Sequence, residues 1–195
     1  MDYKTCCDIF NIQDITFLPV AAHKLIEGSI EDRHKVYLEL LKANNFDVSK
    51  DWFQPIYEAE LSEGKRKGQH FTPNSVNNLV NALADHSKRG EWIHEPTAGT
   101  GSLVIANWWN SISVQMPWEV KPSNKFYGLW ELSDRALPLL LINLSIRGMN
   151  AEVFHGDVLE KKVMCHYIIV NYFDDPLAFS DIVIDSENKL KVSRS

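Results

Sequence analysis

The fold of this chain is decided by the stretch Trp92-Ile93-His94-Glu95-Pro96-Thr97-Ala98-Gly99-Thr100-Gly101-Ser102-Leu103. A short apolar segment predicts a strand, and the glycines after it let the backbone turn sharply. The apolar residues that follow continue at helical spacing to Trp109. Strand, glycine turn and helix form the first unit of an α/β sheet. The free amides and positive dipole at such a helix start favour a carboxylate or phosphate.

Further strands follow in the same pattern. Apolar segments predict strands over residues 126–130, 151–155 and 167–170, with one more possible over 182–184. A helix is predicted after Ser133 or Asp134, and Pro138 requires that it begin late or bend. We therefore predict an open, mostly parallel α/β sheet whose strands are joined by helical crossovers.

The first part of the chain has a different pattern. Ser29 is placed to cap a helix with apolar residues at helical spacing, and a second short helix is predicted over residues 52–61. Residues 62–69 contain two glycines and the basic run Lys65-Arg66-Lys67, which is typical of a loop. Thr72-Pro73 then predicts a helix start. We therefore expect a helical lead over residues 1–61 and an α/β domain over residues 62–195.

Composition excludes several classes. The chain of 195 residues has 20 basic and 26 acidic side chains and a net charge of −6, so it lacks the overall positive charge of dedicated nucleic-acid binders. No signal peptide or membrane span is expected, and the prediction is a cytoplasmic protein. The three cysteines are expected to be free packing residues. No spacing of His, Cys and Asp predicts a metal site.

Each predicted strand ends at a polar side chain. These residues are Glu95, Glu131, Asp157 and Asn171. In a parallel sheet ligands bind beyond the carboxyl ends of the strands, so we expect all four residues at one edge, beside the glycine turn. Val104 occupies the third glycine position of a dinucleotide motif, which disfavours nicotinamide or flavin binding. Taken alone, the turn is equally compatible with a tight corner between strand and helix.

The order and spacing of five segments resemble one family. The segments are Gly68-Gln69-His70-Phe71-Thr72-Pro73, Glu95 to Leu103, Gly128-Leu129-Trp130-Glu131, Gly156-Asp157-Val158-Leu159, and Asn171 after an apolar strand. Over roughly residues 53 to 176 the chain resembles the adenine-specific DNA methyltransferases, most closely the modification subunit of type I restriction systems. The resemblance implies a Rossmann-like sheet, S-adenosylmethionine as cofactor, and DNA as substrate.

The same resemblance implies a cofactor site. Phe71, Thr72 and Pro73 would lie against the methionine part of S-adenosylmethionine, with Gln69 nearby. Glu95 stands where the family usually has Asp. The turn would accept the amino-acid end of the cofactor, Glu131 would accept hydrogen bonds from the ribose hydroxyls, and Asp157 would accept one from the adenine amino group. The turn residues concerned are Thr97, Gly99, Thr100 and Gly101, and Val158 and Leu159 would pack on the adenine ring.

The catalytic motif of the family is Asn-Pro-Pro followed by an aromatic residue, and here the position reads Asn171-Tyr172-Phe173-Asp174. The resemblance implies that Asn171 holds the exocyclic amine of a flipped adenine, which Tyr172 or Phe173 stacks. Both prolines are replaced, so the backbone geometry that they would impose is lost.

Three functions follow from these observations. The first is methylation of adenine in DNA, related to restriction and modification, with Lys65, Arg66 and Lys67 near the phosphate backbone and a partner or specificity subunit completing the DNA surface. The second is a catalytically impaired cofactor-binding or interaction module, such as a regulator or decoy. The altered motif and the few residues after Asn171, where the fold is expected to be truncated, favour this alternative. The third is methylation of a small molecule or protein. A homo- or hetero-oligomer is possible.

Overall fold

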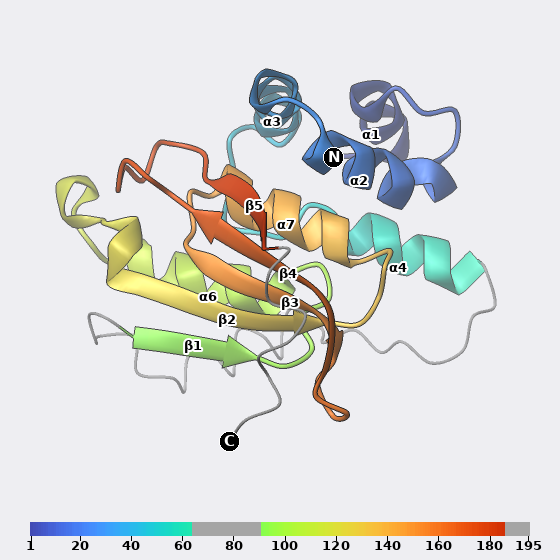
Figure 1. Ribbon diagram of the computed structural model, residues 1–195. Coiled ribbons are helices and arrows are strands. Elements are labelled where there is room, and N and C mark those ends of the chain that lie inside the picture. The colour runs from blue at the N-terminus through green and yellow to red at the C-terminus, as the bar shows by residue number, and fades with distance from the viewer. Residues whose placement is uncertain (64–90, 186–195) are drawn as a thin grey trace.

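The computed structural model describes residues 1–63 and 91–185, and its secondary structure is mixed α/β (Figure 1). Helices α1 (Tyr3–Phe10), α2 (Leu18–Glu27) and α3 (Ile30–Ala43) form one group, with the short 3-10 helix η1 (Ile15–Phe17) before α2. Ser29 begins α3 as expected, because its hydroxyl accepts a hydrogen bond from the Asp32 amide at 3.1 Å. Helix α4 (Gln54–Glu63) follows.

The second group of elements contains the sheet. It consists of β1 (Glu91–Glu95), α6 (Ser102–Ile112), β2 (Lys125–Glu131), α7 (Leu137–Ile146), β3 (Ala151–Asp157), β4 (Lys162–Val170) and β5 (Asp181–Asp185), with 3-10 helices η2 (Pro117–Glu119) and η3 (Pro122–Asn124) before β2. Pro138 lies in the first turn of α7, so the helix starts late, as its sequence predicts. The helix predicted after Thr72-Pro73 lies outside the described residues.

The strands are arranged in chain order, β1-β2-β3-β4-β5. β1 and β2 are parallel, as are β2 and β3, but β4 pairs with β3 in the antiparallel direction and β5 pairs with β4 in the same way. The prediction of a mostly parallel sheet is therefore wrong, and the sheet is mixed. The reason is the short connection 158–161 between β3 and β4, because a parallel crossover needs a dozen or more residues.

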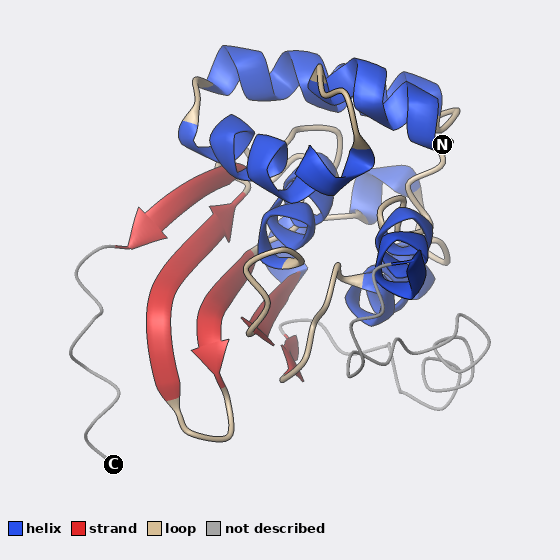
Figure 2. Cartoon of the chain, turned by 90° about the vertical axis from the view of Figure 1, so that its right-hand side faces the viewer, coloured by secondary structure: helices blue, strands red, loops and turns tan. Residues whose placement is uncertain are grey.

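The core lies between the sheet and α7. Every residue of α7 is buried, which explains why its sequence has no polar face. α7 contacts β3, β4 and β5 on one side and α2 on the other. Figure 2 shows the described helices on one side of the sheet. On the opposite face a row of rings crosses neighbouring strands, with the Trp130 and Phe154 centroids 4.9 Å apart and those of Phe154 and His166 4.5 Å apart.

The N-terminal helical segment packs against the elements of the sheet domain. Phe53 and Tyr57 are buried in the same core as α7 and β2. The Tyr57 hydroxyl lies 3.0 Å from Ser133 Oγ, just beyond β2. Residues on both sides of the boundary expected near residue 62 therefore share one core, and the division into a helical lead and an α/β domain stays a prediction.

Candidate functional site

The carboxyl ends of β1, β2 and β3 meet at one edge of the sheet because these strands are parallel. We call this the glycine-turn edge; it carries Glu95, Glu131, Asp157 and the turn 96–101. The structure brings the first part of the predicted site together here. Gln69, Phe71, Thr72, Pro73 and the basic run Lys65, Arg66 and Lys67 lie outside the described residues.

Glu131 is the centre of this edge. One carboxylate oxygen accepts the Gly99 amide at 2.6 Å and the other accepts the Ser133 amide at 2.7 Å. The side chain is buried, and burial raises the pKa of its carboxyl above the ordinary value of 4.5. A carboxylate offers about four acceptor positions, so two amides leave capacity for ligand hydroxyls. These acceptor positions fit a ribose diol, whose two hydroxyls can donate to one carboxylate.

The two glycines of the turn differ in their surroundings. Gly101 has a φ of +100° and Gly99 one of +58°, conformations that favour glycine. A side-chain carbon at Gly101 would lie 2.9 Å from Leu140 Cδ1, so this glycine is required by packing. At Gly99 nothing lies within 4 Å of that position among the described residues. As far as the described residues go, the backbone at Gly99 is therefore open to a ligand.

The start of α6 supplies donors at the same place. Among the described residues no side chain caps it, because its N-cap position is Gly101. Two amides of the preceding turn are engaged within the protein. The Thr97 amide donates to Glu95 Oε1 at 3.2 Å, and the Ala98 amide donates to the Trp130 carbonyl at 2.9 Å. Thr97 lies on the exposed side of the turn. An uncapped helix start beside an open glycine suits a carboxylate ligand.

Asp157 ends β3 at this edge and closes the hairpin to β4. Its Oδ1 accepts the amides of Leu159 at 2.9 Å and Glu160 at 3.1 Å. Val158 is half-buried, whereas Leu159 is 91% exposed. Asp157 therefore combines a turn function with a position at the predicted adenine end of the site.

Asn171 does not share this edge. Ala151, the first residue of β3, is paired with Ile169, near the end of β4, so Asn171 follows β4 at the opposite edge. The expectation that all four strand ends meet is therefore wrong, since β4 runs antiparallel to β3. The length of β3 separates the two edges by roughly 20 Å at about 3.3 Å per residue.

The Asn171 side chain is engaged within the protein. It is 6% exposed, and its Nδ2 lies 3.2 Å, 2.8 Å and 3.3 Å from the carbonyl oxygens of Gly148, Asp175 and Ala178. Tyr172 and Phe173 are 65% and 84% exposed. We call this region the Asn171 edge. A cavity of about 250 Å³ lies beside it, lined in part by Tyr127, Gly148 to Asn150 and Pro176.

A set of polar residues behind the glycine turn was not predicted from the sequence. Asp51 accepts the Thr100 hydroxyl at 2.5 Å, and Tyr57 contacts Ser133. Thr100 is 2% exposed, so its side chain faces the interior and only its backbone can face a ligand. Asp51 also accepts the Phe53 and Gln54 amides, a helix-capping arrangement that the Asp-x-x-Gln spacing could have revealed.

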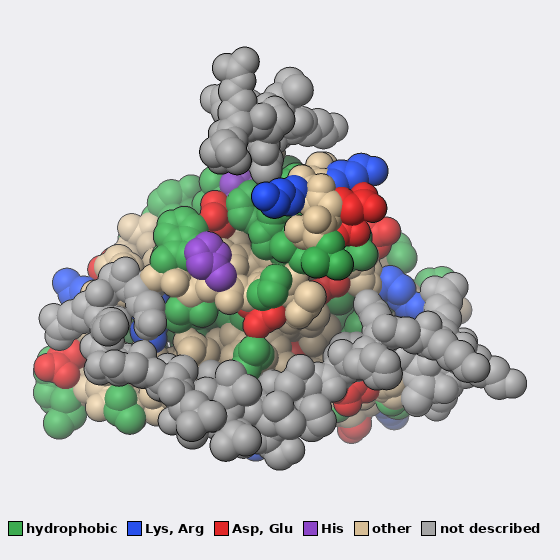
Figure 3. All heavy atoms as spheres, turned by 90° about the horizontal axis from the view of Figure 1, so that it is seen from below, with side chains coloured by type: hydrophobic (Ala, Val, Ile, Leu, Met, Phe, Trp, Pro, Cys, Tyr) green, Lys and Arg blue, Asp and Glu red, His purple; other side chains and the backbone are tan. Residues whose placement is uncertain are grey.

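The charged and metal-ligating side chains bear on which ligands the described part of the protein can hold. Figure 3 shows side chains of both charge signs dispersed among hydrophobic ones on the described part of the face seen from below. Within residues 1–63 and 91–185 no three His, Cys, Asp or Glu side chains are grouped to hold a metal ion. The helices of the same residues include none that is long and apolar enough to cross a membrane.

The strand edge and glycine turn define an α/β protein whose candidate site lies at the carboxyl ends of parallel strands. The family model described as N-6 DNA methylase matches residues 48–180, well over half of the chain, and the chain belongs to this family of DNA methyltransferases. The match begins before Asp51, so it includes α4. Searches of curated proteins and of solved structures gave no match.

Proposed function

We propose that this chain binds S-adenosylmethionine at the glycine-turn edge and serves in methylation of the exocyclic amine of adenine in DNA. The observation that carries the proposal is the junction of Glu131 with the glycine turn. There a buried carboxylate, an open glycine backbone and an uncapped helix start lie within one edge of the sheet. The family match supports DNA as the substrate.

The proposed ligand contacts follow from the chemistry of each group. Glu131 accepts hydrogen bonds from the ribose hydroxyls, and Asp157 accepts one from the adenine amino group. The amides at the start of α6 and the turn around Gly99 hold the carboxylate end. The bound cofactor supplies an activated methyl group. Resemblance to the modification subunit of type I systems supports a role in restriction and modification, with a partner subunit that completes the DNA surface.

Binding can be tested by titration calorimetry with S-adenosylmethionine and S-adenosylhomocysteine. Wild type should bind both saturably, and Glu131→Ala and Asp157→Ala should weaken binding. Asp175→Ala, at the Asn171 edge, is a matched loss of a carboxylate and should retain wild-type affinity. Folded wild-type protein that binds neither compound would contradict the proposal.

The position of Asn171 favours a second candidate function, a cofactor-binding module that does not itself hold the target adenine. Methyl transfer requires the reacting atoms to come within about 3.5 Å, whereas the Asn171 edge lies roughly 20 Å from the glycine-turn edge. The Asn171 amide is also engaged by three carbonyl groups. In this function the chain acts as a regulator or decoy, or a partner supplies the adenine pocket.

A methyl-transfer assay separates the two functions. Labelled S-adenosylmethionine and unmethylated DNA are incubated with the chain, alone and with extract of the native host as a source of partner. The catalytic function is supported if the chain methylates adenine and Asn171→Ala abolishes this activity. The variant must remain folded and still bind the cofactor. Cofactor binding without transfer under both conditions supports the module.

A further inference from the structure

A layer of buried polar side chains lies directly behind the glycine turn. We propose that Asp51 and Asn143 are positioning residues that clamp Thr100 and thereby set the geometry of the turn for its ligand. This inference rests on the proposed function, because it names the groups that hold the proposed cofactor site in shape. None of the clamp residues is expected to touch the ligand with its side chain.

The clamp holds Thr100 by both its side chain and its backbone. The Thr100 hydroxyl donates to Asp51 Oδ2 at 2.5 Å, and the Thr100 carbonyl accepts from Asn143 Nδ2 at 2.7 Å. The same Asn143 amide donates to Asp51 Oδ1 at 2.8 Å. Asp51, Asn143 and Thr100 are 8%, 0% and 2% exposed. The three groups therefore close a buried ring of hydrogen bonds.

The position of Thr100 in the chain gives this ring its importance. Thr100 lies between Gly99 and Gly101, which both have positive φ. Glycine gives access to many backbone conformations, so a turn with two glycines is not fixed by its own torsional preferences. Holding the residue between them restricts the direction of the Gly99 amide, which meets Glu131, and the start of α6. Such restriction reduces the entropy lost when a ligand binds.

Two further contacts extend the same support to the start of α6 and to Glu131. Ser102, the first residue of α6, donates its hydroxyl to the side-chain carbonyl of Gln54. Tyr57 OH lies 3.0 Å from Ser133 Oγ, and the Ser133 amide donates to Glu131. The segment 51–57 therefore contacts the turn, the start of α6 and the second residue after β2. Each of these contacts joins segments far apart in sequence.

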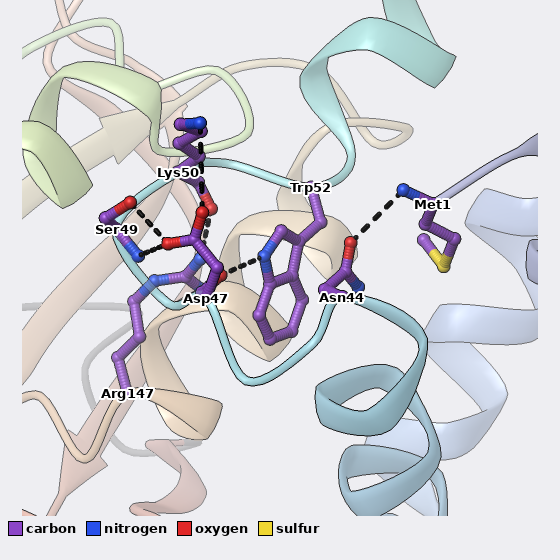
Figure 4. Close-up of polar contacts among 7 residues, drawn as sticks. All are labelled: Met1, Asn44, Asp47, Ser49, Lys50, Trp52 and Arg147. Carbon is purple, nitrogen blue, oxygen red and sulfur yellow. Dashed lines mark hydrogen bonds and ion pairs between the residues drawn. The ribbon is translucent and has the colours of Figure 1, made fainter.

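The charge of Asp51 is balanced inside the protein. Burial raises the pKa of the Asp51 carboxyl, and burial also lowers the pKa of Arg147 to about 10. Arg147 donates to Asn143 Oδ1 at 3.0 Å, so Asn143 links the guanidinium to Asp51. Arg147 also donates to the carbonyl groups of Val48 and Lys50, and Figure 4 shows it beside the segment that leads to Trp52.

The test compares variants of Thr100 with a control on α7. Thr100→Val keeps the shape of the side chain but removes the donor to Asp51, and Thr100→Ser keeps the donor. Ser145→Ala removes a different buried hydrogen bond, from Ser145 Oγ to the Ser180 carbonyl, and serves as the control for lost stability. Two quantities are measured on the full chain: the dissociation constant of S-adenosylhomocysteine, and the amide chemical shifts of Gly99 and Gly101 without ligand.

We expect Thr100→Val to weaken binding about tenfold, because a turn that is no longer held loses more conformational entropy when the ligand binds. Thr100→Ser should recover most of this loss, and Ser145→Ala should lower stability without a comparable loss of affinity. The Gly99 and Gly101 amides should shift farther from wild type in Thr100→Val than in Thr100→Ser, since both variants change the neighbouring side chain but only Thr100→Val removes the donor to Asp51.

Equal affinities in wild type and Thr100→Val would overturn the clamp, as would glycine amides that shift no farther in Thr100→Val than in Thr100→Ser, or a failure of Thr100→Ser to restore binding. If folded wild type binds no cofactor, the proposed function fails. The glycine shifts still report on the clamp in that case, so the two failures are distinguishable.

Discussion

At the glycine-turn edge, the polar groups converge from parallel strands and leave room for a ligand, whereas at the Asn171 edge the polar groups are engaged with the protein itself. Glu131 accepts hydrogen bonds from the amides of Gly99 and Ser133, and no described residue fills the space next to Gly99. Asn171 lies near three carbonyl groups and is buried. Two residues that follow apolar strands thus have different roles, because the direction of the strand decides which edge its end reaches.

The largest effect on stability is expected at the Asn171 edge. Asn171→Ala leaves the carbonyl groups of Gly148, Asp175 and Ala178 without this donor, so the free energy of unfolding should fall by about 3 kcal/mol. Chemical denaturation measures the change. Tyr172→Ala, at an exposed neighbouring position, should change it by less than about 0.5 kcal/mol. A loss for Asn171→Ala no larger than that of Tyr172→Ala would contradict the structural role of Asn171.

At the glycine-turn edge the largest effect is expected on ligand affinity. Glu131→Ala removes the proposed acceptor for both ribose hydroxyls and should weaken S-adenosylhomocysteine binding about 100-fold, which corresponds to about 2.7 kcal/mol. Calorimetry on folded protein measures this change. Glu95→Ala is the comparison on the neighbouring strand and should have a smaller effect, since Glu95 contacts only Thr97 in the described part of the site. Similar losses in both variants would remove Glu131 from the centre of the site.

Substitutions of the two glycines distinguish a role in packing from a role in ligand access. Gly101→Ala places a carbon against Leu140 and should cost about 2 kcal/mol of stability. Gly99→Ala meets no described atom and should cost about 1 kcal/mol through its positive φ alone. Its effect on cofactor affinity should exceed this loss of stability, because the added methyl group enters the open space. An unchanged affinity in Gly99→Ala would show that the ligand does not approach there.

The smallest effect is a pH dependence of binding. Burial raises the pKa of Glu131 above 4.5, so on acidification this carboxyl is protonated at a higher pH than an ordinary glutamate. The charged form is the better acceptor, and affinity should therefore fall as the pH decreases through this raised pKa. In the unfolded chain the carboxyl stays charged to lower pH, so protonation of Glu131 itself favours the folded state in the same range.

Glu131→Gln is the control for this titration, because Asp51 also has a raised pKa. The variant should bind more weakly at neutral pH and lose the part of the pH dependence that belongs to Glu131. An identical pH profile in wild type and Glu131→Gln would assign the titration to another group.

The elements of the sheet could be predicted from sequence, but the direction of its last strands could not. The segment 92–103 and the strand ends at Glu131 and Asp157 follow from local patterns that the structure retains. The hairpin between β3 and β4 could not be predicted, because β4 starts with polar residues at Lys162 and only its apolar end 167–170 has the pattern of a strand. The contacts of Asp51 with Thr100 and Asn143 join residues 49 and 92 positions apart, and no local pattern reports such pairs.

The separation of the two edges is the central claim, and mapping the ligand by nuclear magnetic resonance tests it most directly. Titration of isotope-labelled protein with S-adenosylhomocysteine should shift the amides of Gly99, Thr100, Leu132 and Val158. The amides of Gly148 and of residues 171–175 should remain where they are. Shifts centred on residues 171–175, with the glycine turn unaffected, would place the ligand at the Asn171 edge and contradict the account.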